Sequence, residues 1–345
     1  MKKMIAVLLM VCMVPFSLSA CGKADSKQGQ SEQLQQEEAA DAVAEEKAGD
    51  EIKIGVLLKT EANEYWATMK KGIEEWAEGQ EGVTVDILCA DSENNTSGQL
   101  EQMENMISKD YDALCVAPLS ASNLISGVAK AVEEGIPVID VDEAMDQEAL
   151  KEAGTSVVGI YTTDNETLGA NAAEYIVNVI GEGGKVAIVE GTAGNINSIN
   201  RATGAKNYFE DHGLEVVASQ PADWDRLTAI DVATNIMQSN PDIQAFYCCN
   251  DTMALGVQEA VINAGKQNDI VVVGTDGLKN AYESIKNGEM AATVAQDNVG
   301  IGIACCEKAV QAVQEGWTAD PSAEIPVNYI DSFLVTKDNV DQYLK

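Results

Sequence analysis

From residue 52 onward, short apolar runs alternate with longer segments of mixed polarity. A short apolar run bounded by Gly, Pro, Asn or Asp indicates a buried strand, whereas apolar residues at every third or fourth position indicate a helix. We expect strands at 52–58, 83–90, 113–119, 137–142 and 156–162, and a second series at 185–191, 215–222, 245–250, 271–277 and 290–296.

The segments between these runs have the periodicity of helices. In residues 225–238, Leu227, Ile230, Ala233 and Met237 recur at helical spacing and predict a face that packs on the core. Regular alternation of strand and helix predicts parallel sheets covered by helices on both faces. Because the alternation occurs in two series, the predicted fold class is α/β, with two similar doubly wound parallel-sheet domains.

Polar and aromatic residues gather at the carboxyl ends of these strands. In open parallel sheets this is the edge at which ligands bind, because the loops of neighbouring strands meet there. The candidate site residues are Lys59, Asn63, Tyr65, Trp66, Asp142, Glu143, Arg201, Trp224, Asn250, Asp276 and Gln296. Carboxylates, carboxamides and cations bind neighbouring hydroxyl groups, and aromatic rings cover the apolar face of a sugar ring. The set therefore predicts a site for a neutral, polyhydroxylated ligand.

Several of these positions also have a purely structural interpretation. Asp251 precedes the helix-like TMALG and is expected to be its N-cap, so we prefer Asn250 as the ligand contact. Asp142 and Asp276 are equally consistent with caps or turns when each is taken alone. Their shared location at the strand ends is what favours a binding site.

Charge and motif content argue against several other classes of protein. A net charge of −34 argues against nucleic-acid binding, which needs a concentrated basic surface. His212 is the only histidine, and neither a G-x-S-x-G elbow nor a phosphate-binding G-x-x-x-x-G-K-[ST] loop occurs. We therefore expect no catalytic residue, no metal and no cofactor, which leaves an enzyme on this fold as the less favoured alternative.

Six cysteines fall within the predicted domains, and none of them has C-x-x-C spacing. They are Cys89, Cys115, Cys248, Cys249, Cys305 and Cys306. Most lie in apolar strand or helix runs, so we expect buried thiols that act as small apolar side chains. A disulfide remains an alternative in an exported protein.

The N-terminal 49 residues form two segments outside the predicted domains. Residues 1–20 combine Lys2 and Lys3 with a short apolar stretch, as in a secretion signal, and LSACG at 18–22 resembles the bacterial lipoprotein cleavage box. This predicts cleavage before Cys21 and a lipid on its sulfur, which anchors the protein to the outer face of the cytoplasmic membrane. An ordinary signal with a chance cysteine is the alternative. Residues 21–49 are polar and acidic and predict a flexible tether.

Residues 52–345 also resemble the ribose-type periplasmic sugar-binding proteins of ABC importers. The motifs that carry the resemblance are GIPVI-x-x-D, R-x-x-G, SQPADWDR, NDTMALG, VVGTDG and ATVAQ, in the family's order. The resemblance implies a periplasmic binding protein type I fold and places the family's ligand positions on the eleven candidate residues above. It also implies a monosaccharide ligand that is captured by hinge closure, an ABC transporter permease as partner, and a monomer.

The resemblance further implies two lobes joined by three crossings of the chain. The crossings are expected near 163–164, 296–297 and 328–329. One lobe then comprises residues 50–163 and 297–328, and the other comprises residues 164–296 and 329–345.

Two departures from the ribose-binding pattern bear on the ligand. Ribose binders have Arg where Glu143 stands here, and they lack a lysine at the position of Lys59. The allose-binding members of the family have both the Lys and the Glu, so the pair favours an allose-like aldohexopyranose, with ribose or a cyclitol as alternatives. A binding protein that reports to a membrane receptor or sensor kinase is a second alternative. A sugar-responsive repressor is disfavoured, because the chain has an export signal and no DNA-binding headpiece.

Overall fold

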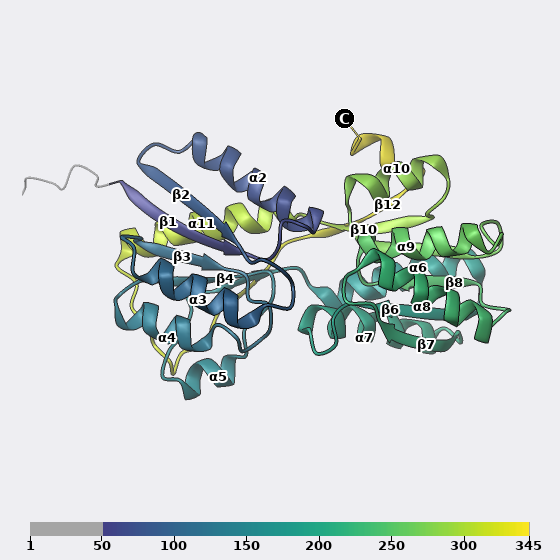
Figure 1. Ribbon diagram of the computed structural model, residues 1–345, viewed down its shortest axis with the longest axis horizontal. Helices are drawn as coiled ribbons and strands as arrows, with labels where there is room; N and C mark the ends of the chain where they lie inside the picture. The colour runs from purple at the N-terminus through teal and green to yellow at the C-terminus, as the bar shows by residue number, and fades with distance from the viewer. Residues whose placement is uncertain (1–50, 345) are drawn as a thin grey trace, which may run out of the picture. The chain divides into compact units, whose positions relative to one another are not determined.

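Two six-stranded sheets form the centre of residues 51–344, which is the part of the chain that the computed structural model describes (Figure 1). The predicted signal peptide 1–20, the tether 21–49 and the predicted lipidation site Cys21 lie outside the described residues. No helix among residues 51–344 has the length and apolar character needed to cross a membrane.

The first sheet has the strand order β11-β5-β4-β3-β1-β2, with all its strands parallel. Its strands are β1 (Ile52–Leu58), β2 (Val83–Cys89), β3 (Ala113–Val116), β4 (Val138–Val141), β5 (Ile160–Thr162) and β11 (Val327–Tyr329). The helices of this lobe are α2 (Glu64–Glu78), α3 (Thr96–Ile107), α4 (Ile125–Glu133), α5 (Gln147–Glu152) and α11 (Asn298–Glu315).

Both faces of this sheet are buried at its centre, which explains why β1 and β3 are almost entirely apolar. Ile54 and Val56 of β1 pack in one core cluster with side chains of α2 and α11, whereas Leu57 packs in a second cluster with side chains of α3 and α4. Successive side chains of a strand point to opposite faces. A strand covered by helices on both sides (Figure 1) therefore needs apolar residues at almost every position.

The second sheet has the order β12-β10-β9-β8-β6-β7. Its strands are β6 (Lys185–Glu190), β7 (Glu215–Pro221), β8 (Ala245–Cys248), β9 (Val271–Asp276), β10 (Ala292–Gln296) and β12 (Ser332–Thr336). The helices of this lobe are α6 (Asn165–Ile180), α7 (Ile196–Asp211), α8 (Arg226–Ser239), α9 (Asp251–Asn263) and α10 (Lys279–Asn287), with a short 3₁₀ helix η1 (Val340–Gln342) near the end of the chain. Only β12 runs antiparallel to its neighbour, β10.

The two sheets repeat one strand order and differ only in the direction of the last strand, and this confirms the predicted fold class. Read from β2 and from β7, the strand orders are equivalent, and in each the first strand of the series lies between its second and third. The chain passes from the first sheet to the second after β5, returns after β10 to form α11 and β11, and enters the second sheet again as β12. Three connections therefore join the lobes, and each lobe has its own switch point, beside β1 and beside β6.

One predicted core position is wrong. Leu227 is 71% exposed, and the buried face of α8 is formed by Ala229, Ala233, Ile236 and Met237. At 3.6 residues per turn, Leu227 lies about 200° around the helix from Ala229. It therefore points to solvent from the first turn of α8, whereas Ala233 and Met237 face the core as expected.

The expectation about the cysteines is confirmed for the side chains that the structure describes. Cys115, Cys248, Cys249, Cys305 and Cys306 are buried free thiols, and Cys89 is partly buried. Burial raises the pKa of the Cys248 thiol well above its usual value, which favours the neutral form expected of an apolar core residue.

Candidate functional site

A cavity of about 350 Å³ lies at the carboxyl ends of strands from both sheets. It is lined by Lys59, Asn63, Tyr65, Trp66, Glu93, Asp142, Asn195, Asn197, Arg201, Trp224, Asn250, Asp276 and Gln296. Every residue predicted from the sequence lines this cavity except Glu143.

The loop after β1 provides one aromatic wall. Asn63 is the N-cap of α2, and its side-chain oxygen accepts a hydrogen bond from the Tyr65 amide at 3.1 Å. Because α2 begins here, Tyr65 and Trp66 lie in its first turn, where their rings meet edge to face with centroids 4.9 Å apart. The Tyr65 hydroxyl donates to Asp142 Oδ1 at 2.7 Å. The cap thus explains how Asn63, Tyr65 and Trp66 come to share one wall.

Lys59 lies on the cavity wall, and Glu143 lies behind it. The Lys59 ammonium is 2.5 Å from Glu143 Oε2, and the Asn195 side-chain amide donates to the same oxygen at 2.5 Å. Burial alone would lower the pKa of Lys59, but the neighbouring carboxylates, Glu143 foremost, outweigh it and raise the pKa. Glu143 is fully buried and does not line the cavity, so the structure does not place it where it would contact a ligand directly.

A second charged pair comes from the other lobe. Arg201 of α7 approaches Asp276 Oδ1 at 3.2 Å, and Gln296 Nε2 donates to the same oxygen at 2.7 Å. Burial raises the pKa of Asp276 to about 7, although Arg201 opposes this effect. Gln296 Oε1 has no hydrogen-bond partner among the described residues and is free to accept from a ligand.

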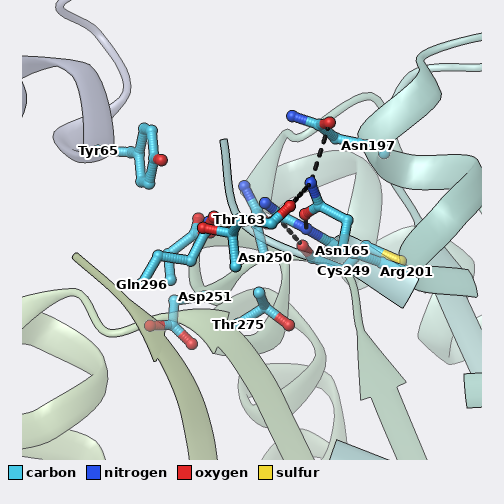
Figure 2. Close-up of polar contacts among 12 residues, drawn as sticks. Tyr65, Thr163, Asn165, Asn197, Arg201, Cys249, Asn250, Asp251, Thr275 and Gln296 are labelled. Atoms are coloured by element: carbon cyan, nitrogen blue, oxygen red, sulfur yellow. Dashed lines mark hydrogen bonds and ion pairs between the residues drawn. The ribbon is translucent and has the colours of Figure 1, made fainter. Parts of the chain in front are cut away.

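Arg201 is held in place by a buried network (Figure 2). Its Nε donates to Asn165 Oδ1 at 2.7 Å, and one of its terminal nitrogens donates to the Cys249 carbonyl at 2.7 Å. Asn165 in turn donates to Asn197 Oδ1 at 3.1 Å and to the Thr163 carbonyl at 3.0 Å. The guanidinium carbon also lies 5.9 Å from the centroid of the Trp224 ring. Arg201 therefore has little freedom to move, which suits a fixed hydrogen-bond donor.

Three cavity residues have a backbone conformation that non-glycine residues rarely adopt. The φ angles are 67° at Asp142, 59° at Trp224 and 112° at Asp276, and the neighbouring Asp223 has 54°. Strain of this kind persists only where the surrounding structure enforces it, and it concentrates at functional sites. Asp142 and Asp276 are thus turn residues and cavity residues at once, so the two interpretations of the sequence do not exclude each other.

The structure adds three residues that the sequence interpretation missed. Asn195 and Asn197 lie at the start of α7, where Asn195 is the N-cap and Asn197 donates to Asp142 Oδ2 at 3.0 Å. Glu93, in the loop after β2, also lines the cavity, and burial raises its pKa while Lys59 opposes the shift. The asparagines were detectable as cap residues in a glycine-rich loop after a strand. Glu93 carries no comparable signal in the sequence.

The expected cap of α9 is wrong by one residue. Asn250 is the N-cap, and its side-chain oxygen accepts from the Met253 amide at 2.8 Å. Asp251 is the first residue of α9 and is fully buried. Asn250 also lines the cavity, so one side chain has both roles that the sequence had divided between two residues.

The cavity combines hydrogen-bond donors and acceptors with aromatic rings. Its two cations, Lys59 and Arg201, are each paired with a buried carboxylate, so neither presents an unpaired positive charge to an anionic group. Among residues 51–344, no group of His, Cys, Asp or Glu side chains is arranged to hold a metal ion. Such a lining suits the binding of a neutral molecule with several hydroxyl groups and one apolar face.

Comparison with known proteins relates this fold to a family. The sequence pattern of the periplasmic binding protein domain family matches residues 54–316. The D-allose-binding periplasmic protein of Escherichia coli K12 is 45% identical over 284 residues, which are 82% of this chain and 91% of that protein. The ribose import binding protein RbsB of Bacillus subtilis 168 is 36% identical over 259 residues, covering 75% of this chain and 81% of that protein.

A solved structure shares both the fold and a substantial part of the sequence. It is an ABC transporter periplasmic solute-binding protein from Actinobacillus succinogenes 130z with bound D-allose. It matches this chain with a TM-score of 0.77 and 34% sequence identity, over 85% of this chain and 100% of that chain.

Proposed function

Because this chain belongs to the periplasmic binding protein family, we propose that it is a membrane-anchored solute-binding protein that captures a monosaccharide and delivers it to an ABC importer. Proteins of this family bind substrates, and the family assignment confirms the resemblance seen in the sequence motifs. The observation that carries the proposal is the cavity, to which both lobes contribute polar groups and aromatic rings. The proposal includes no enzymatic activity and no cofactor.

An allose-like aldohexopyranose is the favoured ligand. The D-allose-binding protein of Escherichia coli and a D-allose complex are both among the proteins that this chain resembles. Lys59, fixed by Glu143, adds a cation to the wall at a point where ribose binders lack one. Because the ribose-binding relative is less similar in sequence, ribose ranks second, and a cyclitol is the further alternative.

Capture by closure explains why the cavity is built from two lobes. Asp142 and Glu143 follow β4 of the first sheet, whereas Asn197 and Asn195 begin α7 beside the second. The two hydrogen bonds between these pairs therefore cross from one lobe to the other. A sugar that contacts both lobes binds the closed form more tightly than the open form and shifts the equilibrium toward it.

The test of ligand identity is a thermal-unfolding series on the full-length chain with D-allose, D-ribose and myo-inositol. A ligand present at about a hundred times its Kd stabilises the folded state by about 2.7 kcal/mol, so the order of the Tm shifts reports the order of affinities. We expect D-allose to give the largest shift. A shift with D-ribose alone would refute the allose-like ligand, and no shift with any of the three compounds would refute all three candidate ligands.

A pair of tryptophan variants tests the site itself. Trp224→Ala removes a ring from the cavity wall and is expected to weaken D-allose binding about tenfold or more. Trp317→Ala removes a partly buried ring that does not line the cavity and is the matched control. If calorimetry gives equal losses for both variants, the cavity is not the sugar site.

The lipid anchor and the partner need experiments in cells. Wild-type protein is expected to incorporate labelled fatty acid and to sediment with membranes, whereas Cys21→Ser is expected to do neither. Labelled D-allose uptake by cells that carry or lack the chain tests delivery to an importer. Unchanged uptake would instead favour the presentation of the sugar to a membrane receptor or sensor kinase.

A further inference from the structure

Asp251 is a buried carboxylate outside the cavity lining, and the proposed sugar contacts do not include it. It is the first residue of α9 and is fully buried; Figure 2 shows its side chain. Its Oδ2 accepts hydrogen bonds from the amides of Gly277 and Leu278, each at 2.8 Å. Its Oδ1 accepts from the Thr293 hydroxyl at 2.7 Å. All three donors belong to segments that follow or form the strands β9 and β10.

These hydrogen bonds hold the turn that presents Asp276 to the cavity. Asp276 has a φ of 112° and Gly277 a φ of 79°, so the turn uses a left-handed conformation at two successive residues. For a residue with a Cβ atom this conformation is costly, and it persists only where other contacts hold it. The amides of the two residues after Asp276 both point at Asp251, which supplies such a contact.

The same carboxylate links the two strands that carry the cavity residues Asp276 and Gln296. Thr293 lies on β10, three residues before Gln296, and Gly277 directly follows Asp276 at the end of β9. Asp276 and Gln296 meet through a 2.7 Å hydrogen bond on the cavity side. Asp251 thus fixes the separation of Asp276 and Gln296 from the side of the sheet that does not face the cavity.

Two glycines leave the space that this arrangement needs. A Cβ atom on Gly274 would lie 2.1 Å from Asp251 Oδ1, so only glycine allows the carboxylate to occupy its position. A Cβ atom on Gly277 would lie 2.5 Å from both the Tyr282 hydroxyl and the Ala295 Cβ. Gly274 thus leaves room for the Asp251 carboxylate, and Gly277 lets the turn pack against Tyr282 and Ala295.

We propose that Asp251 is a positioning residue for sugar binding, which acts by holding the left-handed turn that aims Asp276 at Arg201, Gln296 and the ligand. This inference rests on the proposed function and adds a determinant of affinity outside the cavity. Asp251 does not line the cavity, and it acts on binding chiefly through the position of Asp276.

Matched substitutions at position 251 separate hydrogen bonding from side-chain volume. In Asp251→Asn, the side-chain oxygen still accepts from the two amides and the NH₂ group donates to the Thr293 hydroxyl, so we expect affinity for D-allose close to wild type. In Asp251→Ala the turn loses every one of these partners. We expect D-allose affinity to fall about ten- to a hundredfold. Gly274→Ala, which displaces the carboxylate, is expected to have a similar effect.

A double-mutant cycle tells positioning from general destabilisation. If Asp251 acts through Asp276, Asp276→Asn weakens D-allose binding strongly in the wild-type background and only slightly in Asp251→Ala. Additive losses in calorimetry, or full affinity in Asp251→Ala, would overturn the proposal. Affinities are compared at a temperature where each variant is folded by circular dichroism.

A crystal structure of sugar-free Asp251→Ala tests whether Asp251 holds the turn, without depending on the identity of the ligand. We expect Asp276 to leave the left-handed region and to lose its contacts with Arg201 and Gln296. An unchanged turn would refute the inference even if no sugar bound the wild-type protein. Failure of wild-type protein to bind any sugar, with the turn displaced in the variant, would count against the proposed function alone.

Discussion

Burial controls the charge of Asp276 at the scale of single residues. Its side chain is almost fully buried, and burial raises its pKa to about 7, with a further contribution from the negative charge of Asp142. Arg201 and the hydrogen bond from Gln296 act in the opposite direction. Asp251 is the next carboxylate behind it, and its own pKa is raised by burial and by Asp276. Asp276 is thus placed to change its protonation state near neutral pH.

We predict that D-allose affinity decreases as the pH falls through about 7. The ionised carboxylate accepts hydrogen bonds from Arg201, Gln296 and a sugar hydroxyl, and protonation removes acceptor capacity. Binding on the acidic side of this pKa should therefore release a proton. Calorimetry in buffers of different ionisation enthalpy, on either side of pH 7, measures both effects. If the affinity of Asp276→Asn depends on pH in the same way, another titrating group is responsible.

The stability of the sugar-free protein should depend on pH in the direction opposite to the sugar affinity. Through Asp276, the free energy of unfolding should decrease as the pH rises. Because the folded-state pKa lies above the ordinary value of 3.8, the folded protein binds the proton more tightly than the unfolded chain. The contribution of Asp276 is thus fully present below about 3.8 and is lost as the pH rises through about 7. Urea unfolding of wild type and Asp276→Asn over this pH range measures the free energy of unfolding as a function of pH. The difference between the two slopes is the contribution of Asp276.

At the scale of secondary-structure elements, the contact between α6 and α7 places Arg201. A Cβ atom on Gly169 of α6 would lie 2.0 Å from the Arg201 carbonyl oxygen, and one on Gly204 of α7 would lie 2.0 Å from the Glu166 carbonyl oxygen. The two helices therefore touch backbone to backbone at a pair of glycines. This close approach lets Asn165, at the start of α6, reach the Arg201 guanidinium.

We predict that Gly169→Ala lowers both stability and sugar affinity. The methyl group has no space, so the helices must separate, and overpacking of this kind costs roughly 1–3 kcal/mol. Separation would also lengthen the hydrogen bond from Arg201 to Asn165. Gly79→Ala is the control, because that C-cap glycine has a φ of −88°, which any residue adopts, and its Cβ would meet only the Trp76 carbonyl, at 3.4 Å. Chemical unfolding and D-allose titration of both variants test this prediction. Equal losses of unfolding free energy and of D-allose affinity in the two variants would contradict it.

At the scale of the whole described molecule, the contacts between the lobes differ in their exposure to solvent. The hydrogen bond from Asn195 to Glu143 is buried, whereas the one from Asn280 to Glu64, at 3.2 Å, is exposed. A buried acceptor that loses its donor is costly, while water replaces an exposed partner readily. The buried contact should therefore contribute more to the closed form.

We predict that Asn195→Ser shifts the sugar-free protein toward an open form. Serine still caps α7 but is too short to reach Glu143, so the helix and the hydrogen bond from Asn197 to Asp142 are retained while the contact from residue 195 to Glu143 is lost. Small-angle X-ray scattering should report a larger radius of gyration for this variant than for wild type. Asn280→Ser makes the same replacement at the exposed contact and should leave the scattering unchanged. A radius unchanged in both variants would show that Asn195 does not stabilise closure.

The sequence by itself determined the fold class and most of the cavity lining. Apolar runs such as 52–58 and 271–277 indicate buried strands, and their alternation with helices indicates parallel sheets. Once the strands are known, the edge where ligands bind follows, so residues as far apart as Lys59 and Gln296 were predicted to share one site. Local pattern and chain topology suffice for this because both are properties of the order of residues.

Only the tertiary structure decided which groups face the cavity and which support it from behind. Glu143 directly follows Asp142, yet the chain turns at Asp142 so that one side chain lines the cavity and the other lies buried under Lys59. Likewise, Asn250 has both the cap role and the cavity position that had been divided between it and Asp251, and Asn195 reaches Glu143 from the opposite lobe. These outcomes depend on backbone angles and on contacts between distant segments, which no local pattern of polarity encodes.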